Sequence, residues 1–185
     1  MNCIKCSKQA KIDLKHLGGS FCPACFAEVI EKRVRKSLRE HNWLKPADKI
    51  LFIDDGTLKS KTGIHIIKSI FKNQPFKIDI KKGTIKSVSK LSKGYTKVII
   101  PWNMDDEVEQ YLDALMNNKK IPKTKHIKPL INISDEEIDY FAKVKKIKGK
   151  KRAKTKLGKM LDNLEKRYPG SKFGLLKSFL DYNKK

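Results

Sequence analysis

Apolar residues along the chain change their spacing several times, and each spacing predicts a different element. From Phe26 to about Asn42 they recur every three or four residues, which is typical of an amphipathic helix. Lys49–Ile53 is a short apolar run, as in a buried strand, and the helical spacing returns from Ile64 to Phe71. Strand, loop and helix in this order open a parallel α/β sheet.

The second half of the chain repeats both patterns. Phe76–Ile80 and Lys97–Pro101 read as further strands, and the segment between them is short and basic. Asn103 and the capping box Ser134-x-x-Glu137 are expected to open helices. The helical spacings cover Met104–Met116, Ser134–Val144, Leu157–Tyr168 and Lys172–Tyr182. We therefore predict an α/β fold whose C-terminal part is helical.

The composition shows a strong excess of positive charge, which an α/β fold does not need for its stability. Of 185 residues, 43 are Lys or Arg and 20 are Asp or Glu, which gives a formal net charge of +23. This charge predicts a polyanionic partner, nucleic acid first and an anionic membrane surface second. No apolar run approaches the roughly 18 residues that cross a bilayer, and the N-terminus lacks a secretory signal, so we expect a soluble, cytoplasmic protein.

The four cysteines all lie near the N-terminus, as Cys3-x2-Cys6 and Cys22-x2-Cys25. This is zinc-ribbon spacing, and the fifteen residues between the pairs read as a short hairpin with a turn at Gly18-Gly19. Four thiolates fill the tetrahedral shell of Zn²⁺ and leave no position for substrate, so we expect one structural zinc per chain. Two disulfides or free thiols are the alternative, which a reducing cytoplasm disfavours.

Two basic segments are candidates for contact with nucleic-acid phosphates. One is the polar face of the helix after the ribbon, and the other is a cluster from Lys143 to Lys156. A solvated basic face, or for the cluster a disordered tail, is the alternative. We favour phosphate contact because the helix follows a ribbon in a strongly basic chain, and helical spacing resumes directly after the cluster. The candidate residues are Arg33, Arg35, Lys36, Arg39, Lys150, Lys151, Arg152 and Lys154.

Two pairs of aspartates bear on the chemistry that the chain can perform. Asp54-Asp55 leads the loop after the first strand, where nucleotide-binding proteins of this class arrange glycines and backbone N–H groups around a phosphate. These carboxylates would repel a phosphate, so nucleotide binding is not expected here. Asp105-Asp106 begins a helix, where carboxylates usually cap, and a catalytic or metal-binding role is the alternative.

Four segments, in this order, carry a resemblance to a known family. They are the cysteine ribbon followed by Lys45-Pro46-Ala47-Asp48-Lys49-Ile50, then Pro101-Trp102-Asn103-Met104-Asp105-Asp106-Glu107, then Lys128-Pro129-Leu130 with the Ser134–Ile147 helix, and finally Leu161–Phe173. They resemble segments of the tRNA 2-thiolation enzymes, the thiouridine synthetases of the PP-loop ATP-pyrophosphatase superfamily. The resemblance implies a zinc ribbon at residues 1–27, a basic connecting helix at 28–45, and at 46–185 an abbreviated, degenerate PP-loop (Rossmann-like) parallel-sheet domain with C-terminal helices.

The chain departs from this family at the residues that would perform the chemistry. The family's PP-loop reads S-G-G-K-D-S, and the corresponding residues here are Asp55, Gly56, Thr57, Leu58, Lys59 and Ser60. Only the first glycine and the last serine are kept. The further cysteines by which the catalytic relatives bind an iron–sulfur cluster or handle sulfur have no counterpart. Since all four cysteines belong to the ribbon, we expect neither an iron–sulfur cluster nor ATP on this chain alone.

Together, the resemblance and the departures predict a non-catalytic, tRNA-binding subunit of a tRNA wobble-uridine 2-thiolation complex. It looks like a small version of the second subunit of the eukaryotic cytosolic thiouridylase. Such a subunit would pair with a catalytic thiouridylase paralogue as a heterodimer, a homodimer being the alternative. An active small tRNA sulfurtransferase and a stand-alone zinc-ribbon RNA-binding protein are the other hypotheses, so whether the chain is an enzyme stays open.

Overall fold

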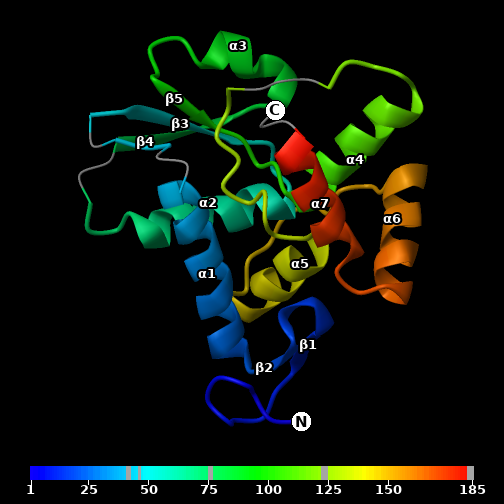
Figure 1. The fold of residues 1–185 in the computed structure, drawn as a ribbon. Coiled ribbons are helices and arrows are strands. Elements are labelled where there is room, and N and C mark those ends of the chain that lie inside the picture. Colours follow the sequence, from blue (N-terminus) through cyan, green and yellow to red (C-terminus); the bar gives the residue numbers. More distant parts are fainter. Residues whose placement is uncertain (41–42, 46, 75–76, 122–124, 183–185) are drawn as a thin grey trace. The chain divides into compact units, whose positions relative to one another are not determined.

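The computed structural model describes residues 1–40, 43–45, 47–74, 77–121 and 125–182 (Figure 1). They group into two compact units. Unit 1 comprises Met1–Glu28, Met104–Lys123 and Ala153–Lys185, and unit 2 comprises Val29–Asn103 and Thr124–Arg152. Helix α1 (Pro23–Glu40) begins in unit 1 and continues into unit 2. No helix within the described ranges is both long enough and apolar enough to cross a membrane.

Unit 1 contains the predicted hairpin. Strand β1 (Ile12–Leu14) pairs antiparallel with β2 (Gly19–Phe21), and the short 3-10 helix η1 (Lys15–Leu17) lies in the turn between them. Gly18 follows η1 with φ 76°, a left-handed conformation that glycine adopts without the strain that a side chain would cause. The turn therefore depends on this glycine.

Three helices complete unit 1: α4 (Met104–Met116), α6 (Lys156–Arg167) and α7 (Ser171–Tyr182). Helix α4 packs against α7 through the stacked rings of Tyr111 and Phe179, whose centroids lie 3.4 Å apart. His16 of the hairpin stacks on Phe173 of α7, with the ring centroids 4.3 Å apart. Aromatic stacking therefore joins the hairpin to α7, and α7 to α4.

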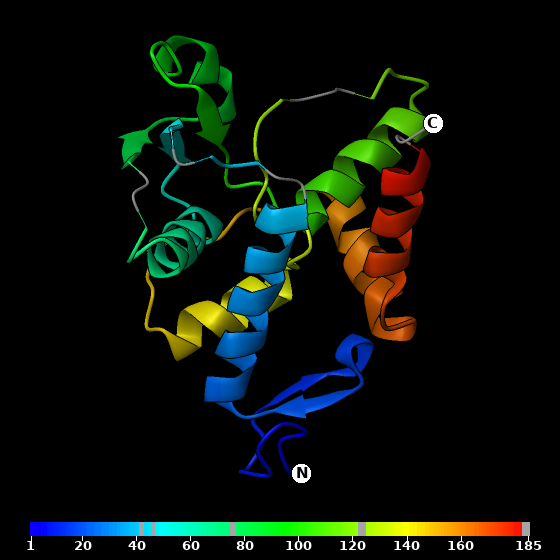
Figure 2. The same cartoon turned by 60° about the vertical axis from the view of Figure 1, so that its left-hand side comes forward.

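Unit 2 is built on a three-stranded parallel sheet with the order β4-β3-β5. Its strands are β3 (Lys49–Asp54), β4 (Lys77–Lys82) and β5 (Lys97–Ile99). Its helices, besides the larger part of α1, are α2 (Leu58–Ile70), the 3-10 helix η2 (Ile85–Ser87), α3 (Val88–Leu91) and α5 (Asp135–Val144). Figure 2 shows the same elements after a turn of 60°.

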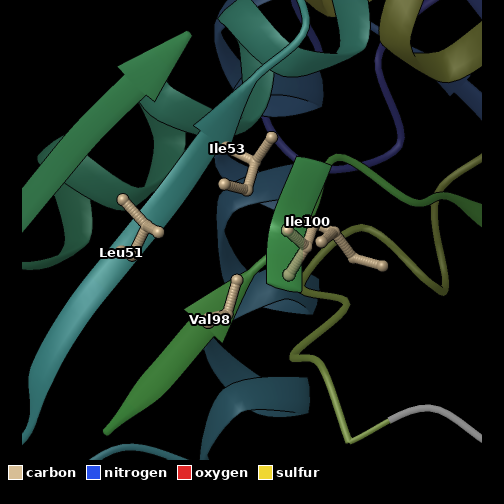
Figure 3. Packing of buried hydrophobic residues seen from close by; sticks show 5 residues of the cluster. Leu51, Ile53, Val98 and Ile100 are labelled. Atoms are coloured by element: carbon tan, nitrogen blue, oxygen red, sulfur yellow. The ribbon is translucent and has the colours of Figure 1, made fainter. Parts of the chain in front are cut away.

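Both faces of the sheet bury apolar side chains. Leu51 and Ile53 of β3 lie on one face with Val98 and Ile100 (Figure 3). The residues that cover this face are Val88, Leu91, Tyr95 and Trp102. Phe52 points to the opposite face, where a Cβ at Gly63 of α2 would come within 3.0 Å of its ring. Burial of each such apolar side chain contributes about 1.5–3 kcal/mol, so these strands stabilise unit 2 from both sides.

The structure confirms the predicted α/β fold with a parallel sheet, a four-cysteine cluster at the N-terminus and C-terminal helices. The predicted helix from Phe26 begins three residues earlier, at Pro23. Helix α3 was not expected from the sequence, because the segment before β5 reads only as short and basic. Three predicted boundaries, at Asn42, Pro46 and Phe76, fall outside the described residues.

Candidate metal centre and the loop after β3

The sulfur atoms of the four cysteines converge on one point. The Sγ atoms of Cys3, Cys6, Cys22 and Cys25 all lie within 4.8 Å of one another, and those of Cys6 and Cys22 are 3.6 Å apart. Sulfurs bound to Zn²⁺ at about 2.3 Å are separated by roughly 3.8 Å in a regular tetrahedron, so this cluster can hold a single ion. None of the four forms a disulfide. Among the described residues it is the one group of three or more His, Cys, Asp or Glu side chains placed to hold a metal.

The local backbone explains why these side chains meet. The first pair lies in a tight turn, where the Ser7 N–H donates to the Cys3 carbonyl over 2.9 Å and Ser7 has φ 58°. The second pair begins α1. Its Pro23 suits the first turn of a helix, and the Cys25 N–H faces the Cys22 sulfur at 3.5 Å. Backbone N–H groups therefore point toward sulfur, as is usual in C-x-x-C metal sites.

The electrostatics of the cluster favour a bound cation. The backbone N–H of Cys22 lowers the pKa of the Cys3 thiol to about 6, although burial acts in the opposite direction. The neighbouring sulfurs of Cys6 and Cys22 raise the pKa of Cys25 to about 12, because a further thiolate would stand beside existing negative charge. A divalent cation at the centre would remove this repulsion and allow all the thiolates to form together.

The loop between β3 and α2 is the counterpart of a phosphate-binding loop, but its own carboxylates occupy it. Asp54 Oδ1 accepts the Gly56 N–H over 3.0 Å and the Ser60 hydroxyl over 2.8 Å, and Asp54 Oδ2 accepts Lys61 Nζ over 2.5 Å. Burial would raise the pKa of Asp54, but the hydrogen bonds from Lys61, Gly56 and Ser60 outweigh it and hold the pKa below its usual value. Asp54 is therefore an ionised carboxylate at the base of the loop.

Three further N–H groups of the loop, those of Thr57, Leu58 and Ser60, also have partners within the chain. Asp55 Oδ1 accepts the Thr57 N–H over 3.0 Å, and the Thr57 hydroxyl accepts the Ser60 N–H over 3.2 Å as the cap of α2. The Leu58 N–H donates to the Lys150 carbonyl over 2.8 Å, and Lys150 forms a parallel bridge with Thr57. In this conformation the Thr57, Leu58 and Ser60 amides are used internally, whereas phosphate-binding loops aim such amides at a ligand.

The basic candidates on α1 are of two kinds. Arg33 donates to the Glu137 carboxylate, and its side chain is only 20% exposed. Arg33 is therefore half-buried and held by an ion pair within unit 2. The exposed candidates on this helix are Arg35, Lys36 and Arg39.

The candidates before the terminal helices are also divided. Lys150 is exposed and Arg152 is half-buried. Lys151 and Lys154 each donate to an aspartate carboxylate. The segment that carries the densest positive charge in the sequence is thus partly neutralised once the chain is folded.

Asp105 belongs to an ion-pair network inside unit 1. Lys172 of α7 donates to Asp105 and, over 2.6 Å, to Asp162 of α6. Burial would lower the pKa of Lys172, but the two carboxylates outweigh it and the pKa is raised. Sequence reasoning did not single out Lys172. The sequence signal that could have identified Lys172 is its place directly before Phe173 and the other apolar positions of the last helix.

Comparisons with known proteins were made for sequence and for fold. No family model matches the sequence. Over 70 residues, 38% of this chain, it is 33% identical to the tRNA-5-methyluridine(54) 2-sulfurtransferase of Thermotoga maritima. That match covers 23% of the sulfurtransferase, so the chain spans about a quarter of the length of this curated relative.

The fold matches a solved structure over nearly the whole chain. It is similar to the U34-tRNA thiolase NcsA from Methanococcus maripaludis with its [4Fe-4S] cluster, with a TM-score of 0.83 and 20% identity. The match covers 98% of this chain and 87% of that one. Both comparisons support the resemblance to the tRNA 2-thiolation family, and the second shows that the chain has the fold of a tRNA thiolase.

Proposed function

We propose that the chain is a non-catalytic, tRNA-binding subunit of a tRNA wobble-uridine 2-thiolation complex in the cytoplasm. It pairs with a catalytic thiouridylase, and a heterodimer is favoured over a homodimer. The names of the two similar proteins support the pathway, because both are tRNA thiolases or sulfurtransferases.

The observation that carries the non-catalytic assignment is the loop between β3 and α2. A PP-loop enzyme must place pyrophosphate against backbone N–H groups at the start of a helix. Here the Leu58 N–H is bonded to Lys150, and Thr57 and Ser60 are bonded within the loop. Asp54 adds an ionised carboxylate beside them. A phosphate would have to displace these bonds and overcome that charge.

The metal centre supports the same assignment. Four sulfurs within 4.8 Å fit around one ion at Zn²⁺–sulfur bond lengths, whereas an iron–sulfur cubane must accommodate four irons and four sulfides between its ligands. We assign a structural Zn²⁺ to Cys3, Cys6, Cys22 and Cys25. All the cysteines of the chain are then ligands, and no thiolate carries sulfur to the tRNA.

Contact with tRNA in this proposal is electrostatic. Arg35, Lys36 and Arg39 on α1 and Lys150 beside the loop are exposed and suit phosphate contact. Arg33 is not included among these residues because its guanidinium donates a hydrogen bond to Glu137. Phosphate contacts position the RNA without reading its sequence, so the catalytic partner selects and thiolates the wobble uridine.

A calorimetric titration of the purified chain with ATP and Mg²⁺ tests the non-catalytic assignment, and no binding is expected. Tight ATP binding would contradict it. Deletion of the gene is expected to lower the 2-thiouridine content of cellular tRNA, measured by mass spectrometry, and the tagged chain is expected to co-purify with a thiouridylase. Unchanged 2-thiouridine and no such partner would favour a stand-alone RNA-binding protein.

One observation favours a second candidate, an active sulfurtransferase. The NcsA structure contains a [4Fe-4S] cluster, and four cysteines also converge in this chain. An anaerobic preparation distinguishes the two. About four irons and four acid-labile sulfides per chain would favour the enzyme, and one zinc per chain without iron would favour the subunit.

A further inference from the structure

One stretch of unit 2, from the start of β4 to the start of β5, carries positive charge that few acidic residues compensate. Residues 77–97 contain the lysines Lys77, Lys81, Lys82, Lys86, Lys90, Lys93 and Lys97. The single acidic residue in this range is Asp79, which accepts the Tyr95 hydroxyl over 2.8 Å. All three of Lys86, Lys90 and Lys93 are exposed, and none of them forms an ion pair with a described residue.

The pairing of charges in the structure ranks the basic segments differently from their density in the sequence. The cluster before the terminal helices is denser in basic residues, yet Lys151 and Lys154 are both paired with aspartates. On α1, Arg33 is paired with a buried glutamate. Folding therefore pairs part of the charge in the two segments that are most basic in sequence, whereas Lys86, Lys90 and Lys93 on the segment that contains α3 form no ion pair with a described residue.

Two lysines lie on the short helical turns, and a third follows them. Lys86 is in η2 and Lys90 is in α3, four residues apart and therefore on one side of the segment, and Lys93 lies in the turn after α3 ends at Leu91. Val88 and Leu91 occupy the opposite side and pack on the sheet face formed by Leu51, Ile53, Val98 and Ile100. Lys86 and Lys90 consequently point away from the sheet, on a segment whose orientation is fixed by buried apolar contacts, and Lys93 is exposed directly after them.

Lys81 of β4 extends this surface at the sheet edge. The register pairs Lys81 with Ile53, so Lys81 lies on the sheet face that α3 covers. Its Nζ lies 4.8 Å from the centroid of the Tyr95 ring, which packs on the same face. The α3 lysine surface is therefore Lys81, Lys86, Lys90 and Lys93.

We propose that the α3 lysine surface binds the sugar–phosphate backbone of RNA. The proposal rests on the proposed tRNA-binding function and adds a surface that the sequence did not indicate. Lysine acts on phosphate as a point charge and lacks the planar fork by which arginine reads guanine, so this contact is independent of sequence. The exposed Ser89 hydroxyl on α3 can donate to a phosphate oxygen between the lysines.

An anionic membrane is the competing polyanion, and the surface fits it less well. Interfacial binding to lipid uses large apolar side chains that enter the acyl region, together with basic ones. Of the large apolar residues on η2 and α3, only Ile85 is exposed, at 44%. Electrostatic attraction alone would remain for a bilayer, whereas RNA also offers phosphates at a spacing that several lysines can contact together.

The test replaces three lysines of this surface at once, in Lys86→Gln, Lys90→Gln and Lys93→Gln. Binding of a fluorescent tRNA transcript is measured by anisotropy between 50 and 200 mM KCl. We expect the Kd at 100 mM to rise at least tenfold and the slope of log K against log salt to become shallower by about 2–3. The matched control replaces three exposed lysines of unit 1, Lys159, Lys166 and Lys177, by Gln, and its Kd should stay within twofold of wild type.

Each outcome separates this inference from the function on which it rests. If wild type binds tRNA and the triple variant binds equally well, the α3 lysine surface is wrong and tRNA binding stands. If both triple variants weaken binding equally, net charge is responsible and the inference fails. If wild type binds no tRNA, the proposed function fails as well. Loss of sedimentation with phosphatidylserine vesicles, without loss of tRNA affinity, would assign the surface to a membrane instead. Circular dichroism checks that each variant is folded.

Discussion

The guanidinium of Arg33 on α1 donates to Glu137 on α5, which is fully buried. The second oxygen of Glu137 accepts the Ser134 N–H over 2.9 Å, and the Ser134 hydroxyl accepts the Glu137 N–H over 3.2 Å. Arg33 thus neutralises the same carboxylate that caps α5. A residue that the sequence presents as one of several basic side chains on a helix is instead part of the fold of unit 2.

Replacing Arg33 by Met should lower the free energy of unfolding by about 3 kcal/mol, because it leaves the buried Glu137 carboxylate without its cation. The salt dependence of tRNA binding should not change. Urea unfolding and anisotropy titrations measure the two quantities. Arg35→Met is the control, since Arg35 is exposed on the same helix. It should alter stability by less than about 0.5 kcal/mol and make the salt slope shallower by about one. Unchanged stability together with a shallower salt slope for Arg33→Met would instead assign Arg33 to the RNA-binding surface.

The ion pairs of Lys172 should make stability depend on pH at both extremes. Burial would raise the pKa of Asp162, but Lys154 and Lys172 lower it, so its stabilising effect is present above the ordinary value of 3.8 and is lost as the pH falls through the lowered value. The raised pKa of Lys172 works in the other direction. Its effect is present below the ordinary 10.5 and is lost as the pH rises through the raised value.

Lys172→Met should therefore lower stability by about 3 kcal/mol at neutral pH, because Asp105 and Asp162 lose a shared cation. The difference from wild type should narrow as the pH falls toward the lowered pKa of Asp162, because protonation of that carboxyl removes a charge that Lys172 pairs with. Urea unfolding between pH 3 and 9 measures it. Lys177→Met, at an exposed position of α7, should match wild type throughout. A difference that does not vary with pH would show that packing, not charge, accounts for the loss.

The metal prediction can be tested without any assay of function. We expect about one zinc per chain by elemental analysis, and removal by a strong chelator should lower the melting temperature, since structural zinc supplies folding energy. Adding zinc back should restore wild type but not Cys22→Ser, which lacks one of the four ligands. Iron with acid-labile sulfide in an anaerobic preparation would contradict the assignment to zinc.

Local signals in the sequence predicted most of these features. The C-x-x-C spacing predicted a cluster that the structure assembles, and the Ser134-Glu137 capping box forms with both of its hydrogen bonds. Periodicity failed for α3, because Val88–Leu91 is one turn long and carries only two inward apolar residues. Such a short segment contains too few positions for a helical period to be recognised.

Partners that are distant in sequence could not be predicted from one chain. Composition counts Arg33 and Lys151 as positive charges, but only the fold shows that each faces a carboxylate. The bridge between Thr57 and Lys150 likewise joins a loop to a segment from a much later part of the chain. No local pattern in the sequence specifies such a pairing, although it is the contact that most changes how the loop is interpreted.

Gly149 makes that pairing testable. A Cβ at this position would lie 2.7 Å from Leu58 Cα and 2.8 Å from Leu58 N, so Gly149→Ala must push residues 149–150 away from the start of α2. We expect a loss of about 1–3 kcal/mol in the free energy of unfolding, as for other overpacked positions, and at least a tenfold faster exchange of the Leu58 amide proton, which then lacks the Lys150 carbonyl.

Gly174→Ala is the matched control, because a Cβ there meets nothing within 4 Å and the residue lies in helix α7. It should stabilise the chain by up to about 1 kcal/mol, the helix propensity difference between the two residues. Gly149→Ala should also be titrated with ATP. No binding by this variant would mean that the loop residues themselves exclude phosphate, since the segment that contains Lys150 has been displaced. Binding of ATP by this variant alone would mean that the contact with Lys150, rather than Asp54 and Thr57, prevents phosphate from entering the loop.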